Sequence, residues 1–315
     1  MVSEFQFINH IKKRFSLDRV GDDCAVLPQN RTTDLLITAD LLIEDIDFRV
    51  DWSTTEQIGH KTLAVSLSDI AAMGGIPTSA MLSIGVPQKL WDEGFPEAFY
   101  RGWHKLASQF GVELIGGDTS RSPDKLVIDS IVLGEIPSGK AVLRSGARQD
   151  DAIFVSGTLG GASAGLMLLE SGQPKLAKTE KIIDRQLCPF PQVELGKQLR
   201  KLGIVTSMID ISDGLASDLL HICEASGVGA VLIAESIPID PNVLEVMRFD
   251  ESFQAALNGG EDFELLFTVP ESKVSALADL PVTQIGTITS DRGNLEVIRD
   301  GTRETLQPSG FQHFS

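Results

Sequence analysis

The sequence predicts two domains in which strands and helices alternate, of the α/β or mixed α+β class. At 315 residues the chain is too long for one ordinary hydrophobic core, so two domains are expected. Short apolar runs alternate with helical periodicity in both halves, and the order of elements alone does not separate the two classes. Pro137-Ser138-Gly139 interrupts this pattern, and the polar stretch Arg144–Asp151 follows it. We therefore expect domains at residues 1–140 and 141–315, with the boundary near 140–150.

The first half carries two predicted helices among short strands. One helix should follow Thr54-Thr55 and run towards Gly74-Gly75, with Asp69 near its end. The second should run from about Pro96 to Phe110 and stop at Gly111, because glycine commonly ends helices. Its apolar residues recur three or four positions apart, as in a core-facing stripe: Phe95, Phe99, Trp103, Leu106 and Phe110. Strands are expected at Leu35–Ile37, Met81–Val86, Glu113–Ile115 and Leu126–Leu133.

The second half continues the alternation. A strand at Ala152–Ser156 should lead through the glycine-rich turn Gly157–Gly161 into a helix that extends through Leu169. A helix that begins at Asp213 should place Leu215, Leu219 and Ile222 on one face. The remaining elements expected are a helix at Pro191–Leu202 and strands at Ile204–Ile209, Val228–Ile233 and Glu264–Val269.

Composition excludes several classes of protein. Apolar residues make up 42% of the chain and charged residues 23%, values typical of a globular protein. The 44 acidic and 27 basic residues give a net charge of −17, which argues against nucleic acid and anionic membranes as partners. A phosphate ligand would also be repelled unless metal ions reverse the local sign. No apolar run approaches the roughly 18 residues of a membrane helix, and residues 1–20 lack a secretory signal. A cytoplasmic protein is expected.

Cysteine and histidine do not form a recognisable site in the sequence. Cys24, Cys188 and Cys223 are scattered without CxxC spacing, which is typical of reduced thiols. Cys24 lies beside Asp23 and is a candidate nucleophile, but no basic residue is near it in sequence. The five histidines form no HxH or HExxH cluster, so a zinc site is not expected.

Acidic residues next to glycine or other small residues are the strongest functional signal. Several of these segments follow apolar runs, which predicts carboxylates at strand ends, in loops held by a rigid scaffold. Ligand sets made only of oxygen suit Mg²⁺, which proteins usually bind together with substrate phosphates. The segments are Gly21-Asp22-Asp23, Thr38-Ala39-Asp40, Ser68-Asp69, Gly116-Gly117-Asp118-Thr119, Asp210-Ile211-Ser212-Asp213-Gly214 and Gly259-Gly260-Glu261-Asp262. The chain therefore points to phosphoryl chemistry.

Four of these segments have a structural interpretation beside the functional one. Asp22-Asp23 taken alone would be an ordinary turn. Ser212 or Asp213 alone could cap a helix N-terminus, whereas Asp210 at a strand end beside a second carboxylate needs a cation or a donor. Asp69 stands near the C-terminal end of its helix, where the macrodipole disfavours an acid, so a metal role is favoured there. Asp118 follows a double glycine, which could mark a plain turn or the close approach of a ligand.

The glycine-rich turn after the first strand of the second half also has two interpretations. Ser156-Gly157-Thr158-Leu159-Gly160-Gly161 could bind a phosphate at a helix N-terminus, or its glycines could serve only a tight strand-to-helix turn. The GxxxxGK[ST] spacing is absent, because neither Gly139-Lys140 nor Gly196-Lys197 is followed by serine or threonine. The chain is therefore not a P-loop protein, and metal ions would replace the P-loop lysine if it binds ATP.

In this order, the acidic segments resemble those of the thiamine-monophosphate kinase family, within the aminoimidazole-ribonucleotide synthetase-like superfamily. The resemblance spans nearly the whole chain. Besides those segments it includes Ser66–Gly74, Leu143–Ala147 and the closing Gly310-Phe311-Gln312-His313-Phe314. It implies an N-terminal domain that dimerises through its sheet and a C-terminal α/β domain behind a nucleotide cleft. It also implies the reaction of ATP with thiamine phosphate to give ADP and thiamine diphosphate.

The resemblance further implies roles for individual residues. Several Mg²⁺ ions would be held by Asp23, Thr38, Ala39, Asp40, Asp69, Asp118, Asp210 and Asp213, with Ala39 using its backbone. ATP would contact Gly117, Asp118, Arg144 and Ser212. Asp69, Asp210 and Arg144 would be catalytic. Glu261 and Phe311 would meet the thiamine moiety, a negative charge facing its cationic ring system and an aromatic ring stacking on it. Some family members have a substrate-side histidine where this chain has Asp47, so Asp47 either faces the cationic ring or is solvated.

The expected mechanism is direct in-line transfer of the γ-phosphoryl group, assisted by several Mg²⁺ ions. The acceptor phosphate is already an anion, so positioning and charge neutralisation matter more than a general base. Two alternatives remain: a related synthetase that phosphorylates an amide oxygen, and a regulatory protein that binds Mg²⁺ or nucleotide without catalysis.

Overall fold

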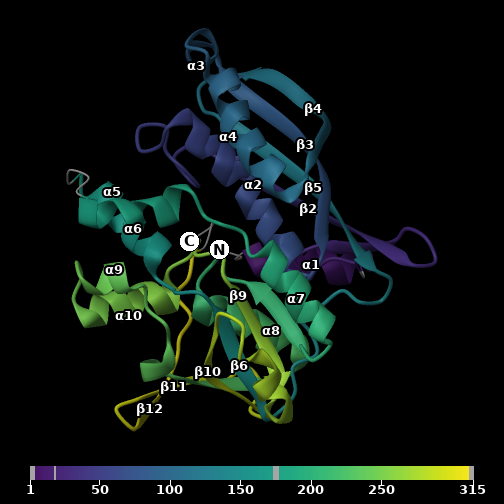
Figure 1. Ribbon diagram of the computed structural model, residues 1–315, viewed down its shortest axis with the longest axis vertical. Helices are drawn as coiled ribbons and strands as arrows, with labels where there is room; N and C mark the ends of the chain where they lie inside the picture. The colour runs from purple at the N-terminus through teal and green to yellow at the C-terminus, as the bar shows by residue number, and fades with distance from the viewer. Residues whose placement is uncertain (1–3, 18, 173–176, 312–315) are drawn as a thin grey trace.

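The computed structural model describes residues 4–17, 19–172 and 177–311, and it contains two β-sheets with a long helix between them (Figure 1). Both sheets are mixed and mostly antiparallel. Only β3 with β4 and β11 with β8 pair in parallel among the described strands. The expected alternation of strands and helices is confirmed, in its mixed α+β form.

The first sheet is built from the first half of the chain in the order β1-β2-β5-β3-β4. Its strands are β1 (Ala25–Pro28), β2 (Thr33–Ile43), β3 (Ile76–Pro87), β4 (Glu113–Ser122) and β5 (Val127–Pro137). The helices of this half are α1 (Glu4–Phe15), α2 (Thr55–Ala72), α3 (Gln88–Asp92) and α4 (Phe95–Phe110). Helix α2 packs on one face of the sheet, and α4 packs on α2.

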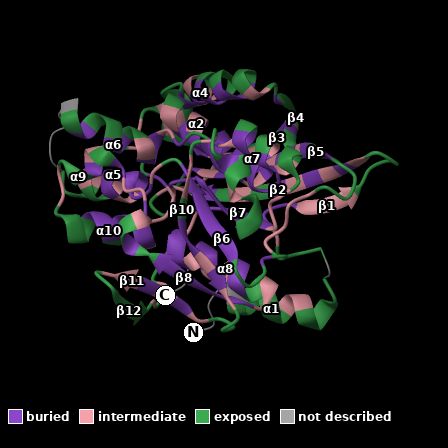
Figure 2. Ribbon diagram, turned by 60° about the horizontal axis from the view of Figure 1, so that its bottom comes forward, coloured by how far each residue is buried: buried purple, intermediate pink, exposed green. Residues whose placement is uncertain are grey.

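The second sheet has the order β12-β11-β8-β10-β6-β9-β7. Its strands are β6 (Asp151–Ser156), β7 (Ser207–Asp210), β8 (Gly229–Ile233), β9 (Leu265–Pro270), β10 (Val282–Thr289), β11 (Leu295–Arg299) and β12 (Thr302–Thr305). The α-helices are α5 (Gly161–Glu170), α6 (Ala177–Leu187), α7 (Val193–Leu202), α8 (Leu215–Ser226), α9 (Pro241–Leu244) and α10 (Phe249–Asn258). Two 3₁₀ helices are η1 (Ala234–Ser236) and η2 (Glu271–Leu277). Buried residues concentrate in β6, β7 and β8, whereas β12 is exposed along its length (Figure 2).

Helix α2 connects the two halves of the molecule. The Thr54 side chain caps its first turn by accepting from the Gln57 N–H, and the Gln57 side-chain oxygen accepts from the Thr54 N–H. Most of its residues are buried on every face, as expected of a helix inside a core rather than on a surface. It contacts β2 and β5 on one side and α7 and β7 on the other. This position carries Asp69 from the first half of the chain to the end of β7 in the second.

Helix α4 confirms the predicted aromatic stripe. Phe99, Trp103 and Leu106 are at most 1% exposed, and Gly111 ends the helix in a left-handed conformation. Gly102 allows α4 to pack tightly on α2, because a Cβ there would lie 1.9 Å from the Glu56 carbonyl oxygen.

Two acidic residues expected at strand ends lie inside strands instead. Strand β2 continues through Asp40 to Ile43, and β4 continues through Asp118 to Ser122. In β2 the alternation of side chains turns Thr38 and Asp40 towards α2, while Ala39 between them is exposed on the opposite face. The prediction of loops at these two segments is therefore wrong, because pairing with β5 and β3 extends the strands past their apolar residues.

Candidate active site

Three carboxylates from distant parts of the sequence meet beside the C-terminal end of α2. Asp23 precedes β1, Asp69 is in the last turn of α2, and Asp210 ends β7. One oxygen of each lies within 4.8 Å of an oxygen of the other two. Asp23 and Asp210 are 8% and 2% exposed, and Asp69 is partly buried. The predicted convergence of these three acids is thus present in the structure, and we call them the carboxylate cluster.

Hydroxyl groups donate hydrogen bonds to the carboxylates of this region. Thr38 Oγ1 donates to Asp69 Oδ2. Ser68 Oγ donates to Asp210 Oδ2 at 2.6 Å. One turn earlier on α2, Ser66 Oγ donates to Asp40 Oδ2 at 2.7 Å. These donors fix the carboxylates without neutralising them.

The carboxylate cluster is electrostatically strained without a counter-ion. Burial raises the pKa of Asp69 well above its ordinary value, and the charges of Asp40, Asp210 and Asp23 raise it further. Burial and the charge of Asp23 raise the pKa of Asp210 to about 7. Burial raises the pKa of Asp40 to about 6. Buried acids that repel one another in this way either bind protons or need a cation.

One protein cation reaches the carboxylate cluster in the described parts of the chain. Arg144 Nε donates to Asp23 Oδ1 at 3.1 Å, and Nη2 donates to the same oxygen. The backbone N–H of Arg144 also donates to Asp22 Oδ1 at 2.9 Å. The structure therefore places Arg144 beside the carboxylate cluster, and Asp22 anchors the loop that carries it.

The donor set of the carboxylate cluster fits a divalent hard cation. Asp23 Oδ2 is buried and has no hydrogen-bond partner among the described residues. Such an orphaned acceptor is costly unless a ligand satisfies it. The other donors nearby are carboxylate and hydroxyl oxygens, which Mg²⁺ prefers over nitrogen or sulfur ligands.

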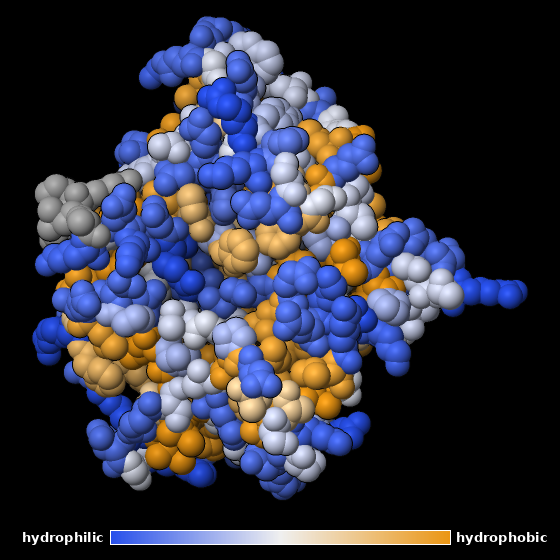
Figure 3. Space-filling model, in the orientation of Figure 1, coloured by the Kyte–Doolittle hydropathy of each residue, from blue (hydrophilic) through white to orange (hydrophobic). Residues whose placement is uncertain are grey.

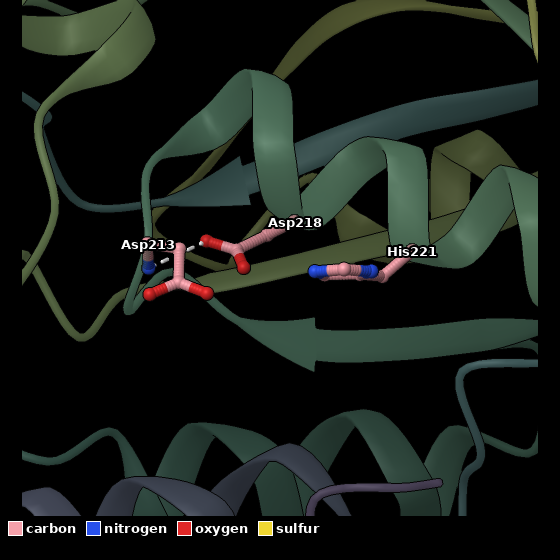
Figure 4. A group of neighbouring side chains, drawn as sticks. All are labelled: Asp213, Asp218 and His221. Carbon is pink, nitrogen blue, oxygen red and sulfur yellow. Dashed lines mark hydrogen bonds between the residues drawn. The ribbon is translucent and has the colours of Figure 1, made fainter. Parts of the chain in front are cut away.

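Asp213 belongs to a second group and not to the carboxylate cluster. Figure 4 shows it beside Asp218 and His221 of α8, with ligand atoms within 4.8 Å of one another. Burial and the charge of Arg144 lower the pKa of His221 to about 4, so the imidazole is neutral at physiological pH. Neither Asp218 nor His221 was predicted as a site residue, although their i, i+3 spacing places them on one helical face.

The start of α8 excludes a capping role for Ser212 or Asp213. The helix begins at Leu215, two residues later than expected, and its first turn is capped from within. Asp218 Oδ2 accepts hydrogen bonds from the backbone N–H groups of Asp213 and Gly214, at 3.1 and 3.0 Å. The Asp213 carboxylate is therefore not needed as a cap.

A cavity of about 500 Å³ adjoins these groups. It lies between the first sheet and helices α5 and α6, and the face of the molecule in Figure 3 is hollowed between these parts. Apolar walls come from residues such as Phe48, Val65 and Phe263. Six residues expected in the site line the cavity: Asp40, Asp47, Ser212, Asp213, Glu261 and Phe311.

Two loops from the second half form one side of this cavity. The Glu261 N–H donates to the Ser212 carbonyl at 2.8 Å. Glycine is required at position 260, because a Cβ there would lie 2.4 Å from the same carbonyl oxygen. Glu261 itself has a φ of 67°, a left-handed conformation that is costly for a non-glycine residue and frequent at functional sites. The Phe311 N–H donates to the Asp213 carbonyl at 3.3 Å, which brings Phe311 to the same place.

Comparisons with known proteins agree with this geometry. The family model described as AIR synthase related protein, N-terminal domain, matches residues 21–136, and the model of the C-terminal domain matches residues 148–298. The thiamine-monophosphate kinase of Bacillus subtilis is 37% identical, over 99% of this chain and 100% of the relative. That of Escherichia coli K12 is 38% identical, over 94% and 91%. The chain belongs to the thiamine-monophosphate kinase family.

A solved structure of the same kind confirms the fold. AaThiL complexed with AMPPCP and TMP superimposes with a TM-score of 0.89 at 33% identity, covering 99% of this chain and 97% of that one. The expected two-domain fold of the aminoimidazole-ribonucleotide synthetase type is therefore confirmed for this thiamine-monophosphate kinase family member. No helix in the described residues is both long and apolar enough to span a bilayer.

In this member of the kinase family, Glu261 is already paired. Lys61 of α2, with a side chain only 4% exposed, places Nζ 2.8 Å from Glu261 Oε1. Gln186 of α6 donates through Nε2 to Glu261 Oε2. Glu261 therefore has two protein partners at the cavity, and its contact with the cationic ring stays a prediction. Neither Lys61 nor Gln186 was predicted, because both lie on regular helices far from Glu261 in sequence.

Gly117 and Asp118 lie away from the carboxylate cluster of the same chain. The register Asp40–Ser130–Leu82–Gly117 crosses the first sheet, which puts three strand spacings, about 14 Å, between β2 and β4. The glycine at 117 allows the close approach of β3, because a Cβ there would lie 1.9 Å from the Leu82 carbonyl oxygen. All but the last residue of β4 are exposed.

A carboxylate of the same chain binds the backbone N–H groups of the glycine-rich turn before α5. Asp262 Oδ2 accepts from the Gly160 N–H at 2.6 Å, and Oδ1 accepts from the Ala162 N–H at 3.0 Å. This carboxylate occupies the position that a bound phosphate would take, so the structural interpretation of the turn is correct and the phosphate interpretation is not.

Cys24 is unsuited to nucleophilic catalysis. Its thiol is 2% exposed. Burial and the neighbouring charges of Asp69 and Asp23 raise the pKa of Cys24 well above its ordinary value. A thiol that stays protonated is a poor nucleophile, so the sequence-based argument against this role agrees with the structure.

Proposed function

We propose that the protein phosphorylates thiamine phosphate with ATP to give thiamine diphosphate and ADP. The supporting relatives are thiamine-monophosphate kinases that match nearly the full length of the chain. The observation that carries the proposal is the carboxylate cluster with its orphaned Asp23 oxygen, next to a cavity that Asp40 also lines. This combination suits a cationic bridge between two polyanionic substrates.

Each part of the site has a role in direct in-line transfer. Bound at the carboxylate cluster, Thr38, Asp40 and the Asp213 group, several Mg²⁺ ions would neutralise the phosphates of both substrates. Ala39 would add its backbone carbonyl. Arg144 holds Asp23 in place and supplies a fixed positive charge beside it. No general base is needed, because the acceptor is a phosphate oxygen that is already ionised.

The two substrates would approach from different sides. Ser212 and Arg144 lie beside the carboxylates and would contact ATP. Glu261, Phe311 and Asp47 line the cavity and would contact the thiamine moiety. Asp47 has its own structural bond, since its Oδ2 accepts from the Ile43 N–H at 2.7 Å.

Gly117 and Asp118 would complete the site from a second copy of the chain. The distance across the sheet separates them from the carboxylate cluster of their own chain, and β4 is an exposed edge strand. The sheet face opposite α2 exposes Leu41 and Met81, and β4 exposes Ile115, by 56%, 40% and 54%. A homodimer formed through this sheet would cover these residues and bring β4 of one protomer to its partner.

A coupled assay for ADP tests the proposal. The protein should release ADP in the presence of Mg²⁺, ATP and thiamine phosphate, and the product should be thiamine diphosphate. Unphosphorylated thiamine should be a poor acceptor, because it offers no anionic phosphate. Phosphorylation of thiamine with a comparable kcat/KM would contradict the assignment.

The same assay separates the alternatives. ADP release that requires an amide acceptor and ignores thiamine phosphate would favour a synthetase of the same superfamily. ATP binding without ADP release for any acceptor would favour a regulatory protein. The domain boundary near residue 140 and the cytoplasmic location stay predictions.

A further inference from the structure

A group of polar side chains on the cavity wall is separate from the carboxylate cluster. It consists of Lys61 on α2, Gln186 on α6 and Glu261 in the loop before β9, and all three line the cavity. Lys61 Nζ lies 2.8 Å from Glu261 Oε1 and also donates to the Asp47 carbonyl at 3.3 Å. We call these residues the Lys61–Gln186–Glu261 triad.

The charges within this triad cancel. Lys61 is almost completely buried. If the ion pair with Glu261 broke, the ammonium group would remain a buried, unpaired charge, which is costly. A ligand in the cavity therefore meets a neutral, hydrogen-bonding surface here and not a free anion. A cationic ring would find little electrostatic attraction here. A neutral heterocycle could form hydrogen bonds with this surface through its own donors and acceptors.

Gln186 lines the cavity, and its side chain carries an unsatisfied acceptor that is buried at the cavity wall. A carboxylate accepts only, so the Gln186 amide must turn its NH₂ group towards Glu261. The amide oxygen Oε1 is left over, and it is buried without a partner in the part of the chain that the structure describes. The residue is only 5% exposed. A buried acceptor in this state is costly, and a donor brought by the ligand would satisfy it.

We propose that Gln186 is a specificity-determining residue that accepts a hydrogen bond from the exocyclic amine of an aminopyrimidine ring. The inference rests on the proposed function, since thiamine phosphate carries a cationic thiazolium and a neutral aminopyrimidine. Nearby walls formed by Leu166, Leu187 and Phe263 suit a flat aromatic ring. Lys61 is a positioning residue, because it fixes Glu261 and through it the orientation of the Gln186 amide.

The test compares thiamine phosphate with an analogue in which oxygen replaces the exocyclic amine. An acceptor in place of the amine would face Gln186 Oε1 and repel it. Sites built to hydrogen-bond a substrate group discriminate strongly against analogues that lack it. The wild-type protein should therefore prefer thiamine phosphate by about 10²-fold or more in kcat/KM.

Gln186→Met replaces the amide with an apolar side chain of the same length. The variant should raise KM for thiamine phosphate roughly tenfold, as expected for one lost hydrogen bond of about 1.4 kcal/mol. It should keep kcat and the KM for ATP. The ratio of kcat/KM for thiamine phosphate to kcat/KM for the oxygen analogue should fall to within a few fold. Gln198→Met, at an exposed position on α7, is the matched control and should behave as the wild type.

The outcomes separate this inference from the function it rests on. Failure of the wild-type protein to release ADP with thiamine phosphate would overturn the proposed function. Turnover with equal kcat/KM for the two acceptors would overturn only the role of Gln186, and this measurement needs no variant. A Gln186→Met protein that loses kcat but keeps the full preference would show a structural role and would also overturn it.

Discussion

At the residue scale, each member of the carboxylate cluster is held at one oxygen by a different side chain. Thr38 binds Asp69, Ser68 binds Asp210, and Arg144 binds Asp23. The bonded oxygens are fixed in place, so the remaining oxygens are pre-organised for a cation rather than free to turn away. Pre-organised charge of this kind is effective in catalysis, because no reorganisation is needed during the reaction.

Replacing one cluster carboxylate by its amide should separate catalysis from folding. Asp69→Asn or Asp210→Asn should lower kcat about 10²-fold or more, because a charge that supports the phosphates is lost. The amide oxygen can still accept from Thr38 or Ser68, so circular dichroism and the melting temperature should show a folded protein. Exposed Asp279→Asn is the control. Near-normal kcat at saturating Mg²⁺ in both cluster variants would make these acids structural.

At the element scale, the starts of α5 and α8 are satisfied by acids from the same chain. Asp262 binds the N–H groups at the start of α5, and Asp218 binds those at the start of α8. In α5 the acid comes from a loop about a hundred residues away and also lies near Arg185, with 3.7 Å between Arg185 Nη2 and Asp262 Oδ1. The helix therefore depends on a buried carboxylate for its N-terminus.

Asp262 should leave a signature in the pH dependence of stability. Burial raises its pKa to about 6 from an ordinary value of 3.8. Between these values the folded state binds more protons than the unfolded state, so this residue lowers the free energy of unfolding as pH rises from about 4 to 6. Asp262→Asn does not titrate. Its stability relative to the wild type should therefore rise across this window, by roughly 1–3 kcal/mol.

Urea unfolding at intervals from pH 4 to 7 measures this difference. The amide binds one fewer backbone N–H, which adds an offset independent of pH. Asp250→Asn is the control, because a hydrogen bond from Arg299 lowers the pKa of the exposed Asp250. Its difference from the wild type should change below about pH 4 and stay nearly constant from pH 4 to 7. A difference between Asp262→Asn and the wild type that stays constant with pH would contradict the prediction.

At the scale of the whole molecule, the acidic residues act on both stability and assembly. Ionised carboxylates about 5 Å apart repel by roughly 3 kcal/mol per pair at an effective dielectric of about 20. The net charge of −17 adds to this repulsion. Ligands that bridge these acids bind only the folded protein and should therefore stabilise it.

Melting temperatures with Mg²⁺, with a non-hydrolysable ATP analogue, and with both should show a shift that is larger than additive. Each ligand completes the coordination of the other, and stabilisation grows with ligand concentration. Monovalent salt at matched ionic strength should shift the melting temperature less, because it screens charge without bridging the acids. Equal, additive shifts would indicate separate sites, and the absence of any shift would mean that the acids bind no metal.

Assembly can be tested on the open face of the first sheet. Met81→Glu should convert a dimer to monomers in sedimentation experiments, because it puts charges into an apolar interface. Turnover should fall with it if Asp118 comes from the partner. The matched control is Ile233→Glu, which changes an exposed apolar residue of the second sheet. A variant that remains dimeric would exclude this face as the interface.

The sequence by itself determined the elements and chemistry that depend on neighbouring residues. Helix α4 follows from its own apolar period, and α2 from its capping residues and closing glycines. Asp210 at the end of β7 follows from the apolar run before it. The prediction of a Mg²⁺ site follows from ligand types alone, and it stays a prediction.

Only the tertiary structure decided what depends on pairing between distant segments. Strands β2 and β4 extend past Asp40 and Asp118 because β5 and β3 pair with them. Asp262 occupies the start of α5, and Lys61 and Gln186 reach Glu261, through contacts between segments far apart in the sequence. Such contacts leave no periodic signal, because each depends on how whole elements pack. Local periodicity therefore predicted many of the elements that carry the acids, and packing decided where the strands end and which acids meet.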